Sequence, residues 1–369
     1  MNILNFFLLI KNFFKARWVF QRPLKKKFVI YDLANSYIIF KYISQKQSAI
    51  YFTRWEEINF FILCFSIVKY GFKDVRKSYK KAFFYLIEPK VVITLMSSQI
   101  AFYKLKKQFP NIITISIQNS VGSLEFMKLL KHAKKKSLSC DYFLFFSEDF
   151  KRLYEKFISI EKKSVIIGSF RNNFFYKKSS NKKKLLFISK ANWNIKGALN
   201  EIILLNLIIK FLKKNKMGKI DICLKTNDEI VKDYYRKNLN QSYINIINKK
   251  NNYLITDNYE NIIFTDSTLG YECMAKGKKI ISLSLGSLKK NWCLKNNFTP
   301  INKFGYPYKI KNEGFCWSNS CSEKKVIKLL KNILHMKQSS FNRNIKAYKN
   351  KIMFFDQQNS KFKKLICSF

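Results

Sequence analysis

Residues Asn261 to Leu283 read NIIFTDSTLGYECMAKGKKIISL, and this stretch decides the fold of the chain. An apolar run ends in a polar turn, a short helical run follows, and Gly277 closes that run before a second apolar run begins. The pattern predicts a strand, a loop, a helix and a second strand, in that order. Such units build parallel sheets that are covered by helices.

The loop in this stretch has the composition of a phosphate site. Ser267 and Thr268 bring two hydroxyls and free backbone N–H groups to the start of a helix, where the macrodipole favours an anion. Glu272 follows inside the helix, where its carboxylate can accept hydrogen bonds from sugar hydroxyls of the same ligand. Together these residues indicate a nucleotide-sugar site. The alternative is that they only cap the helix and compensate its dipole.

Length and composition indicate a folded protein of about two domains. A chain of 369 residues is too long for one small core. Its 47% apolar and 17% aromatic residues are too many for a disordered chain. Two domains imply a cleft between them.

The formal net charge of +47 points first to nucleic acid or an anionic membrane. Most of the excess is Lys spread along the whole chain, and Lys, Ile, Asn and Phe share A/T-rich codons, so a biased genome explains the charge without a polyanion partner. The sequence contains no recognised nucleic-acid module. We therefore expect no specific nucleic acid, and only a general attraction to anionic lipid or phosphate substrates.

The eight Cys include no Cys-x-x-Cys pair, and several lie in apolar runs, as expected of reduced thiols in a cytosolic protein. Only two His are present and no ligand spacing is recognisable, so no metal site is predicted. The sequence also lacks Asp-x-Asp, the motif with which many transferases hold a divalent ion.

Residues 1–27 form an apolar segment that ends in the basic patch Lys25-Lys26-Lys27. Its uninterrupted apolar part is too short to span a bilayer. Basic residues follow the apolar part and no small-residue cleavage site is present, unlike in a secretory signal. One interpretation is a helix that lies in the membrane interface. The other is an ordinary first helix packed on its own domain.

From residue 27 onward, short β-type runs alternate with helical runs, as in parallel sheets covered on both faces. We expect a first domain at 28–173, a linker at 174–184, a second domain at 185–338, and a C-terminal helix at 339–369 that can cross back. Strands are expected at 28–31, 49–53, 91–95, 112–117, 142–146, 165–167, 185–189, 219–224, 262–265 and 279–283. Helices are expected near 57–70, 74–87, 98–108, 122–135, 147–158, 198–214, 226–238, 268–276 and 322–336.

Several short motifs follow one another along the chain. They are Val29-Ile-Tyr-Asp32, Thr53-Arg-Trp-Glu-Glu-Ile-Asn59, Pro89-Lys-Val-Val-Ile-Thr-Leu95, Phe102-Tyr-Lys-Leu-Lys106, Ile115-Ser-Ile-Gln-Asn119, Asp141-Tyr-Phe-Leu-Phe-Phe146, Gly168-Ser-Phe-Arg-Asn-Asn173 and Asp266-Ser-Thr-Leu-Gly-Tyr-Glu272. In order and spacing, over residues 28–285, they resemble the bacterial surface carbohydrate biosynthesis proteins, glycosyltransferases of the GT-B type. The last motif is similar to one in capsular Kdo transferases, and more loosely to CDP-glycerol glycerophosphotransferases and sialic-acid-pathway epimerases.

The chain departs from the family pattern at two positions. Trp55 follows Arg54 where the family has a smaller residue, often Gly, and Ser120 follows Gln118-Asn119 where Gly is expected. Both departures lie on the expected acceptor side.

The resemblance implies an α/β protein of two Rossmann-like doubly wound domains that face each other across a cleft. The C-terminal domain would hold the nucleotide-activated donor at Ser267, Thr268, Gly270 and Glu272, and the acceptor would approach from the N-terminal domain. No cofactor is implied, because the nucleotide-sugar is itself the donor substrate.

The departing nucleotide carries negative charge, which backbone N–H groups, hydroxyls and a cation must stabilise where no metal does. Lys225, after the strand expected at 219–224, is the first candidate for that cation, unless it is an ordinary surface lysine. Ser189 and Lys190 follow the strand expected at 185–189 and can make a similar phosphate contact.

An inverting transfer also needs a base near the acceptor hydroxyl. Glu57 is the first choice, and Glu56 and Asp32 are the other candidates, since all three lie near strand ends of the first domain; the alternative is that they only cap helices. Four further residues are assigned to the acceptor side. They are Arg54, Gln118 and Asn119, of which the two amides can orient hydroxyls, and Arg171, which either anchors a phosphate or fixes the linker.

The sequence therefore predicts a metal-independent, GT-B-type glycosyltransferase that transfers a sugar or related group to a surface polysaccharide or lipid-linked precursor. We expect it in the cytoplasm or peripherally on the inner face of the cytoplasmic membrane. The alternatives are a nucleotide-sugar epimerase of the same architecture and a non-enzymatic basic protein that binds anionic lipid or nucleic acid. The latter would show clustered basic residues with interleaved aromatics, which the sequence lacks.

Overall fold

The computed structural model describes residues 14–121, 130, 132, 137–175, 183–190, 196–225, 228–247, 251–265, 267–283, 304–308, 310–319 and 322–369, with the side chains of 183–184 and 196–200 left out. The chain divides into two compact units. Unit 1 contains the chain up to Phe145, then Lys151–Ile166 and Asn359–Phe369. Unit 2 contains Phe146–Phe150 and Ile167–Gln358.

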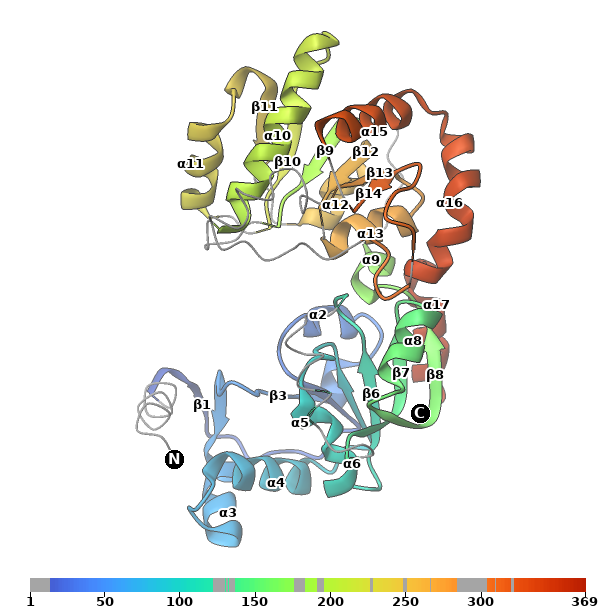
Figure 1. Ribbon diagram of the computed structural model, residues 1–369. Coiled ribbons are helices and arrows are strands. Elements are labelled where there is room, and N and C mark those ends of the chain that lie inside the picture. Colours follow the sequence, from blue (N-terminus) through green and yellow to red (C-terminus); the bar gives the residue numbers. More distant parts are fainter. Residues whose placement is uncertain are drawn as a thin grey trace. The chain divides into compact units, whose positions relative to one another are not determined.

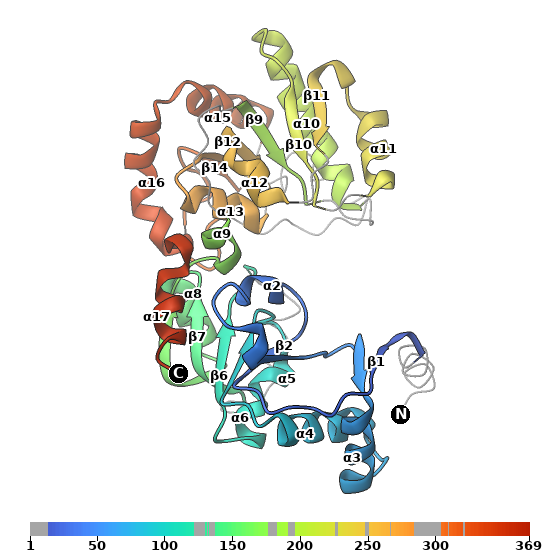
Figure 2. The ribbon, with the colours of Figure 1, turned by 180° about the vertical axis from the view of Figure 1, so that it is seen from behind.

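Unit 1 is built on a six-stranded parallel sheet with the strand order β3-β2-β5-β6-β7-β8 (Figures 1 and 2). Its strands are β2 (Phe28–Tyr31), β3 (Ser48–Tyr51), β5 (Val91–Thr94), β6 (Ile113–Ile117), β7 (Ser139–Phe145) and β8 (Ser159–Ile166). Every residue of β2 and β5 is buried, because helices cover both faces of a parallel sheet. The edge strand β8 is mostly exposed or half-buried.

The helices of unit 1 begin where the sequence supplies caps. Asp74 accepts a hydrogen bond from the N–H of Lys77 at 3.1 Å and so starts α4 (Val75–Ile87). Asn59 starts α3 (Phe60–Tyr70) in the same way. The other helices among the described residues are α2 (Ser36–Ile39), α5 (Ile100–Tyr103), α6 (Leu105–Gln108), α17 (Ser360–Ile366), and α8 (Glu148–Tyr154), whose residues are divided between the two units.

The first domain differs from expectation at its N-terminal side. Residues 57–59, expected in a helix, form the strand β4 (Glu57–Asn59) instead. It pairs in parallel with β1 (Arg17–Val19), part of the segment expected to be helical, so both predictions are wrong there. Pairing with a remote strand overrides the local helical pattern. Residues 1–13 and most of the helix expected near 122–135 lie outside the described residues.

Unit 2 contains a second six-stranded parallel sheet, with the order β11-β10-β9-β12-β13-β14. Its strands are β9 (Lys183–Ile188), β10 (Ile220–Cys223), β11 (Ile244–Ile247), β12 (Tyr259–Phe264), β13 (Lys279–Leu283) and β14 (Trp317–Ser318). Its helices are α9 (Phe170–Phe174), α10 (Lys196–Lys214), α11 (Glu229–Asn238), α12 (Asn252–Asp257), α13 (Thr268–Ala275), α15 (Glu323–His335) and α16 (Gln338–Ile352). The expected strand-loop-helix-strand unit is confirmed as β12, α13 and β13.

The boundaries of the units differ from those expected. Residues 167–173 belong to unit 2, because Ser169 and Asn172 hydrogen-bond to Glu272 of α13. The terminal helix expected at 339–369 is two helices, α16 in unit 2 and α17 in unit 1. Gln358 and Asn359 lie between them with φ angles of 56° and 53°, a backbone conformation that a continuous helix cannot hold.

Each sheet winds outward in two directions from an inner strand. In unit 1 the chain passes from β2 to β3 on one side and later adds β5 on the other. In unit 2 it passes from β9 to β10 and β11, then adds β12 on the opposite side. Ligands of open parallel sheets bind at the carboxyl ends of the strands where this reversal occurs. The loops after β2 and β5, and those after β9 and β12, are therefore the candidate sites.

Candidate functional site

The loop between β12 and α13 leaves the start of the helix uncapped by a side chain. Ser267 occupies the N-cap position, but its hydroxyl accepts no hydrogen bond from the first turn of α13. Its carbonyl accepts one from the N–H of Gly270 at 3.0 Å. Ser267 and Thr268 are both partly exposed, and Asp266 lies outside the described residues. Apart from that of Gly270, the N–H groups of this first turn are ones for which a helix offers no internal partner, so this end suits an anion.

Gly270 sets the distance between α13 and its preceding strand. A Cβ atom at this position would lie 2.2 Å from Cγ of Phe264, much closer than two carbon atoms can approach. Gly270 is therefore required for α13 to pack directly on the end of β12, with its N-terminus at the loop.

Glu272 differs from expectation because its carboxylate is fully buried and faces protein groups. Oε1 accepts hydrogen bonds from the Ser169 hydroxyl and from the Tyr253 hydroxyl at 3.2 Å, while its carbonyl accepts one from Nδ2 of Asn172 at 3.0 Å. The contact with sugar hydroxyls that the sequence suggested is not available in this arrangement. Glu272 instead joins α9 and α12 to α13.

Burial raises the pKa of Glu272; the charge of Arg171 and the hydrogen bonds from Ser169 and Tyr253 oppose this shift without cancelling it. Arg171 itself was expected on the acceptor side. It lies in α9 of unit 2, with its guanidinium 5.7 Å from the ring centroid of Tyr253.

The loop after β9 is anchored by a buried acid that sequence reasoning missed. Glu201 is fully buried in α10; Oε1 accepts a hydrogen bond from the N–H of Lys190 at 2.9 Å, and Oε2 accepts one from the Tyr235 hydroxyl. The hydroxyls of Tyr235 and Ser189 lie 3.0 Å apart. Burial raises the pKa of Glu201, while these hydrogen bonds oppose the shift. The available signal was an acidic residue inside an almost wholly apolar helix.

The remaining donor candidates lie in the loops after β9 and β10. Ser189 is buried and bonded to Tyr235, so its hydroxyl faces the protein. Lys190 is half-buried and Lys225, which follows β10, is exposed. Because β10, β9 and β12 are adjacent parallel strands, the three loops that carry these residues emerge at the same edge of the sheet.

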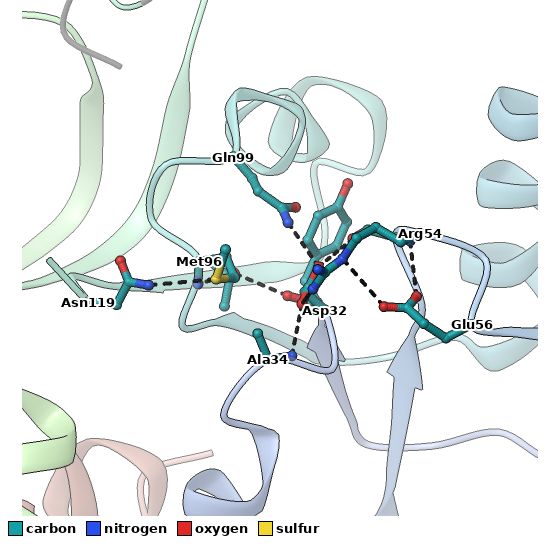
Figure 3. A network of polar contacts seen from close by, with 10 residues as sticks. Asp32, Ala34, Arg54, Glu56, Met96, Gln99 and Asn119 are labelled. Carbon is teal, nitrogen blue, oxygen red and sulfur yellow. Dashed lines mark hydrogen bonds and ion pairs between the residues drawn. The ribbon is translucent and has the colours of Figure 1, made fainter. Parts of the chain in front are cut away.

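In unit 1, Asp32 is the centre of a polar network at the reversal point of the sheet (Figure 3). It follows β2, is buried, and has a φ of 91°. Oδ1 accepts hydrogen bonds from the N–H of Ala34 at 2.8 Å and from Nη2 of Arg54 at 3.1 Å. Oδ2 accepts one from the Thr53 hydroxyl and one from Nε2 of Gln99 at 3.0 Å. Asp32 therefore ties together the loops after β2, β3 and β5.

Burial by itself raises the pKa of Asp32, but the bonds from Thr53, Ala34 and Gln99 and the charge of Arg54 outweigh it, so its pKa lies below the ordinary value. A carboxylate with a low pKa and four donors is a weak base. Its geometry suits positioning better than proton abstraction.

The other acceptor-side candidates are only partly brought together. Glu56 pairs with Nε of Arg54 at 3.4 Å and so joins the Asp32 network (Figure 3). Glu57 instead forms an ion pair with Arg17 between β4 and β1, outside this network. Gln118 is buried and donates to the carbonyl of Ser120 at 3.0 Å. Nδ2 of Asn119 lies 3.6 Å from Sδ of Met96.

Trp55 shows how the chain accommodates its departure from the family pattern. It has a φ of 64°, the conformation for which a Gly would be suited, and it is buried. Its ring lies 5.5 Å from that of Tyr79, centroid to centroid. Packing of the large side chain stabilises a backbone conformation that is otherwise unfavourable.

The architecture of two Rossmann-like units matches solved structures of the GT-B type. The wall teichoic acid polymerase TagF matches at a TM-score of 0.53 with 11% identity, covering 94% of this chain and 89% of that chain. The UDP-GlcNAc 2-epimerase of Methanocaldococcus jannaschii, in complex with UDP-GlcNAc and UDP, matches at 0.53 with 12% identity, covering 94% and 100%. The chain thus has a GT-B-like fold, as the sequence predicted.

The family comparison points in the same direction. Residues 198–368 match a family model described as "putative O-antigen biosynthesis protein". This match supports the resemblance to surface carbohydrate biosynthesis proteins over the C-terminal part of the chain. No curated protein matches the sequence.

Proposed function

We propose that this protein is a glycosyltransferase-like enzyme that transfers a sugar or related group from a nucleotide-activated donor to a surface polysaccharide or lipid-linked precursor. The observation that carries the proposal is the loop after β12. It lies beside the reversal point of the second sheet and presents the uncapped N-terminus of α13 with two hydroxyls. An epimerase of the same fold is solved with UDP-GlcNAc and UDP, which supports a nucleotide-sugar as the ligand.

In this proposal, the N–H groups of α13 and the hydroxyls of Ser267 and Thr268 bind the diphosphate of the donor. Lys225 and Lys190 stabilise the negative charge that grows on the leaving nucleotide. Glu201 holds the loop that carries Lys190, and Glu272 holds α13 against α9 and α12. The absence of Asp-x-Asp from the sequence supports transfer without a metal.

Unit 1 supplies the acceptor side in this proposal. Asp32 positions Arg54 and Gln99, whose side chains it binds directly. Glu57 is retained as a candidate base, although its ion pair with Arg17 would have to open before it could accept a proton.

The donor site is tested by thermal unfolding of the full chain with nucleoside diphosphates and nucleotide-sugars. A ligand at about 100 times its Kd stabilises the folded state by about 2.7 kcal/mol, which is a readily measured rise in Tm. Lys225→Ala and a Ser267→Ala variant should lower the response, whereas Lys237→Ala, an exposed lysine in α11, should not. If none of these ligands raises Tm, the proposal fails.

An epimerase is the second candidate, because the epimerase structure matches as well as the polymerase. The two activities differ in their need for an acceptor. Incubation with the donor alone, followed by product analysis, separates them: an epimerase brings the donor to an equilibrium mixture with its epimer, whereas a transferase releases nucleotide only by slow hydrolysis.

We also propose that the protein associates peripherally with an anionic membrane. Phe61 and Val68 lie two turns apart in α3 and are 44% and 88% exposed, and Phe72, just beyond the end of the helix, is 71% exposed. Phe60 and Phe20 extend this aromatic surface, with ring centroids 5.6 Å apart. Large apolar side chains exposed in this way on a basic protein favour a bilayer surface. Across the described residues, no helix has the length and apolar character needed to cross a membrane.

A further inference from the structure

A hollow of about 570 Å³ opens in unit 1 beside the Asp32 network. Thr53 and Gln99 line it, and both also donate hydrogen bonds to Asp32. The hollow therefore lies at the reversal point of the first sheet, the place where ligands of open parallel sheets bind. Its volume falls within the range of small-molecule sites and exceeds what one phosphate ion fills. A sugar-sized ligand fits it.

The charge of this hollow is strongly positive. Arg76, Lys77 and Lys80 line it, against a single acidic side chain, that of Asp74. Asp74 is already engaged in capping α4. Throughout the part of the chain that the structure describes, none of the three cations has an ion-pair partner within 4 Å.

The position of these cations in α4 is unfavourable without a ligand. Arg76 and Lys77 lie in the first turn, where the helix dipole disfavours positive charge and acidic residues are usual. Burial lowers the pKa of Lys80, and the neighbouring charges of Lys77 and Lys104 lower it further. An anion in the hollow would offset both effects.

The wall of the hollow adds hydrogen-bond donors. Tyr31 and Tyr51 line it and their hydroxyls have no hydrogen-bond partner among the described residues. Burial raises the pKa of both phenols, so they stay protonated and can donate. The hollow thus offers three positive charges and two phenol donors, whereas a carboxylate has one negative charge and two acceptor oxygens to pair with them. A phosphate ester carries up to two charges and three terminal oxygens.

We propose that this hollow binds a phosphoryl group of the acceptor, held by Arg76, Lys77 and Lys80 with the hydroxyls of Tyr31 and Tyr51. The inference rests on the proposed function, because it makes the acceptor a phosphorylated sugar or a prenyl phosphate. Both sources present the same group to the same side chains.

The test is isothermal titration of the full chain with three sugars that differ only at C6: glucose, glucuronate and glucose 6-phosphate. Glucose 6-phosphate should bind most tightly. The Lys77→Ala/Lys80→Ala double variant should weaken its binding by about tenfold or more, the size expected for lost charge-assisted hydrogen bonds. Lys80→Arg should retain binding, which separates charge from packing. Lys162→Ala, an exposed lysine in the edge strand β8, should bind like the wild type.

A short-chain prenyl phosphate is titrated alongside to identify the source of the group. If the prenyl phosphate binds more tightly than glucose 6-phosphate and depends equally on Lys77 and Lys80, the site is assigned to a lipid carrier. If glucose 6-phosphate binds more tightly, the site is assigned to a phosphorylated glycan. The inference is overturned if the double variant binds glucose 6-phosphate as well as the wild type, if glucuronate binds equally well, or if no phosphate binds.

The same variants also separate this inference from the proposed function. The cations belong to unit 1 and the donor loops to unit 2, so the double variant should keep the rise in Tm with nucleotide. If nucleotides raise Tm but phosphate binding does not depend on Lys77 and Lys80, only the inference of a phosphoryl site is contradicted. If phosphate binding depends on these lysines but no nucleotide raises Tm, the proposed donor site is contradicted and an anion site in unit 1 remains.

Discussion

Asp32 and Glu272, two of the carboxylates that the sequence marks, are both buried, and their surroundings shift their pKa values in opposite directions. Asp32 receives four hydrogen bonds and has a lowered pKa. Glu272 has a raised pKa, because the effect of burial outweighs the hydrogen bonds that Ser169 and Tyr253 donate to it. Each holds several elements together, so each is better described as a positioning residue than as a group in contact with the ligand.

Replacement of Glu272 by Gln is expected to change how stability depends on pH. The folded state holds the proton of Glu272 more tightly than the unfolded chain does, where the pKa is about 4.5. The stability that this group contributes is therefore complete below that value and is lost as the pH rises through the raised pKa. Gln is neutral throughout. The Tm of Glu272→Gln minus the Tm of the wild type should therefore grow as the pH rises above about 4.5.

Glu272→Ala serves as the comparison, because it removes the acceptor as well as the charge. It removes the acceptor of the buried Ser169 hydroxyl, at a cost of about 1–3 kcal/mol, and one acceptor of the half-buried Tyr253 hydroxyl; unfolding experiments at any pH should show this loss. A difference between Glu272→Gln and the wild type that stays constant with pH would contradict the raised pKa.

At the scale of elements, the close contact between α13 and β12 fixes the position of the loop that joins them. Gly270 permits this contact, and its neighbour Phe264 is itself fully buried. Gly270→Ala should force α13 away from the strand and destabilise the protein by about 1–3 kcal/mol, as overpacking does. Chemical denaturation measures this loss.

Two variants make that measurement specific. Gly218→Ala should change stability by less than about 0.5 kcal/mol, because no atom lies within 4 Å of a Cβ placed there. Phe264→Leu combined with Gly270→Ala should cost less than the sum of the two single changes, since the smaller side chain makes room. Strict additivity would show that the contact does not set the position of α13.

At the scale of the whole molecule, the aromatic surface of α3 and the excess of Lys together predict membrane association. The full chain should co-sediment with vesicles that contain phosphatidylglycerol, and less with neutral vesicles or at high salt. Phe61→Glu/Val68→Glu should weaken this binding by about tenfold or more, because each buried apolar side chain contributes about 1.5–3 kcal/mol.

Ile230→Glu is the matched control, since Ile230 is 62% exposed but lies in α11 of unit 2. It should sediment like the wild type. If Ile230→Glu loses as much vesicle binding as Phe61→Glu/Val68→Glu, net charge alone governs binding. If both variants bind vesicles like the wild type, α3 is not the contact surface.

The alternation of apolar runs and helical runs predicted the parallel α/β plan, and the strands at 28–31 and 279–283 agree with the structure residue for residue. The candidates Asp32 and Ser267 were recognisable because each lies in the polar turn that ends an apolar run. Glu201 was visible as an acid in an apolar helix, but no local pattern shows that its partners are Lys190 and Tyr235. Such partners are far apart in the chain and meet only when the strand order is fixed.

Most strands and helices, and the loops that carry hydroxyls and charge, could be predicted from the sequence, because hydrophobic periodicity and turn residues act locally. Only the tertiary structure decided that Glu272 is enclosed by Ser169 and Tyr253, that β1 and β4 pair, and that Arg76, Lys77 and Lys80 gather around one hollow. These features depend on contacts between segments remote in the sequence, and burial and long-range electrostatics, rather than local propensity, fix what each side chain does.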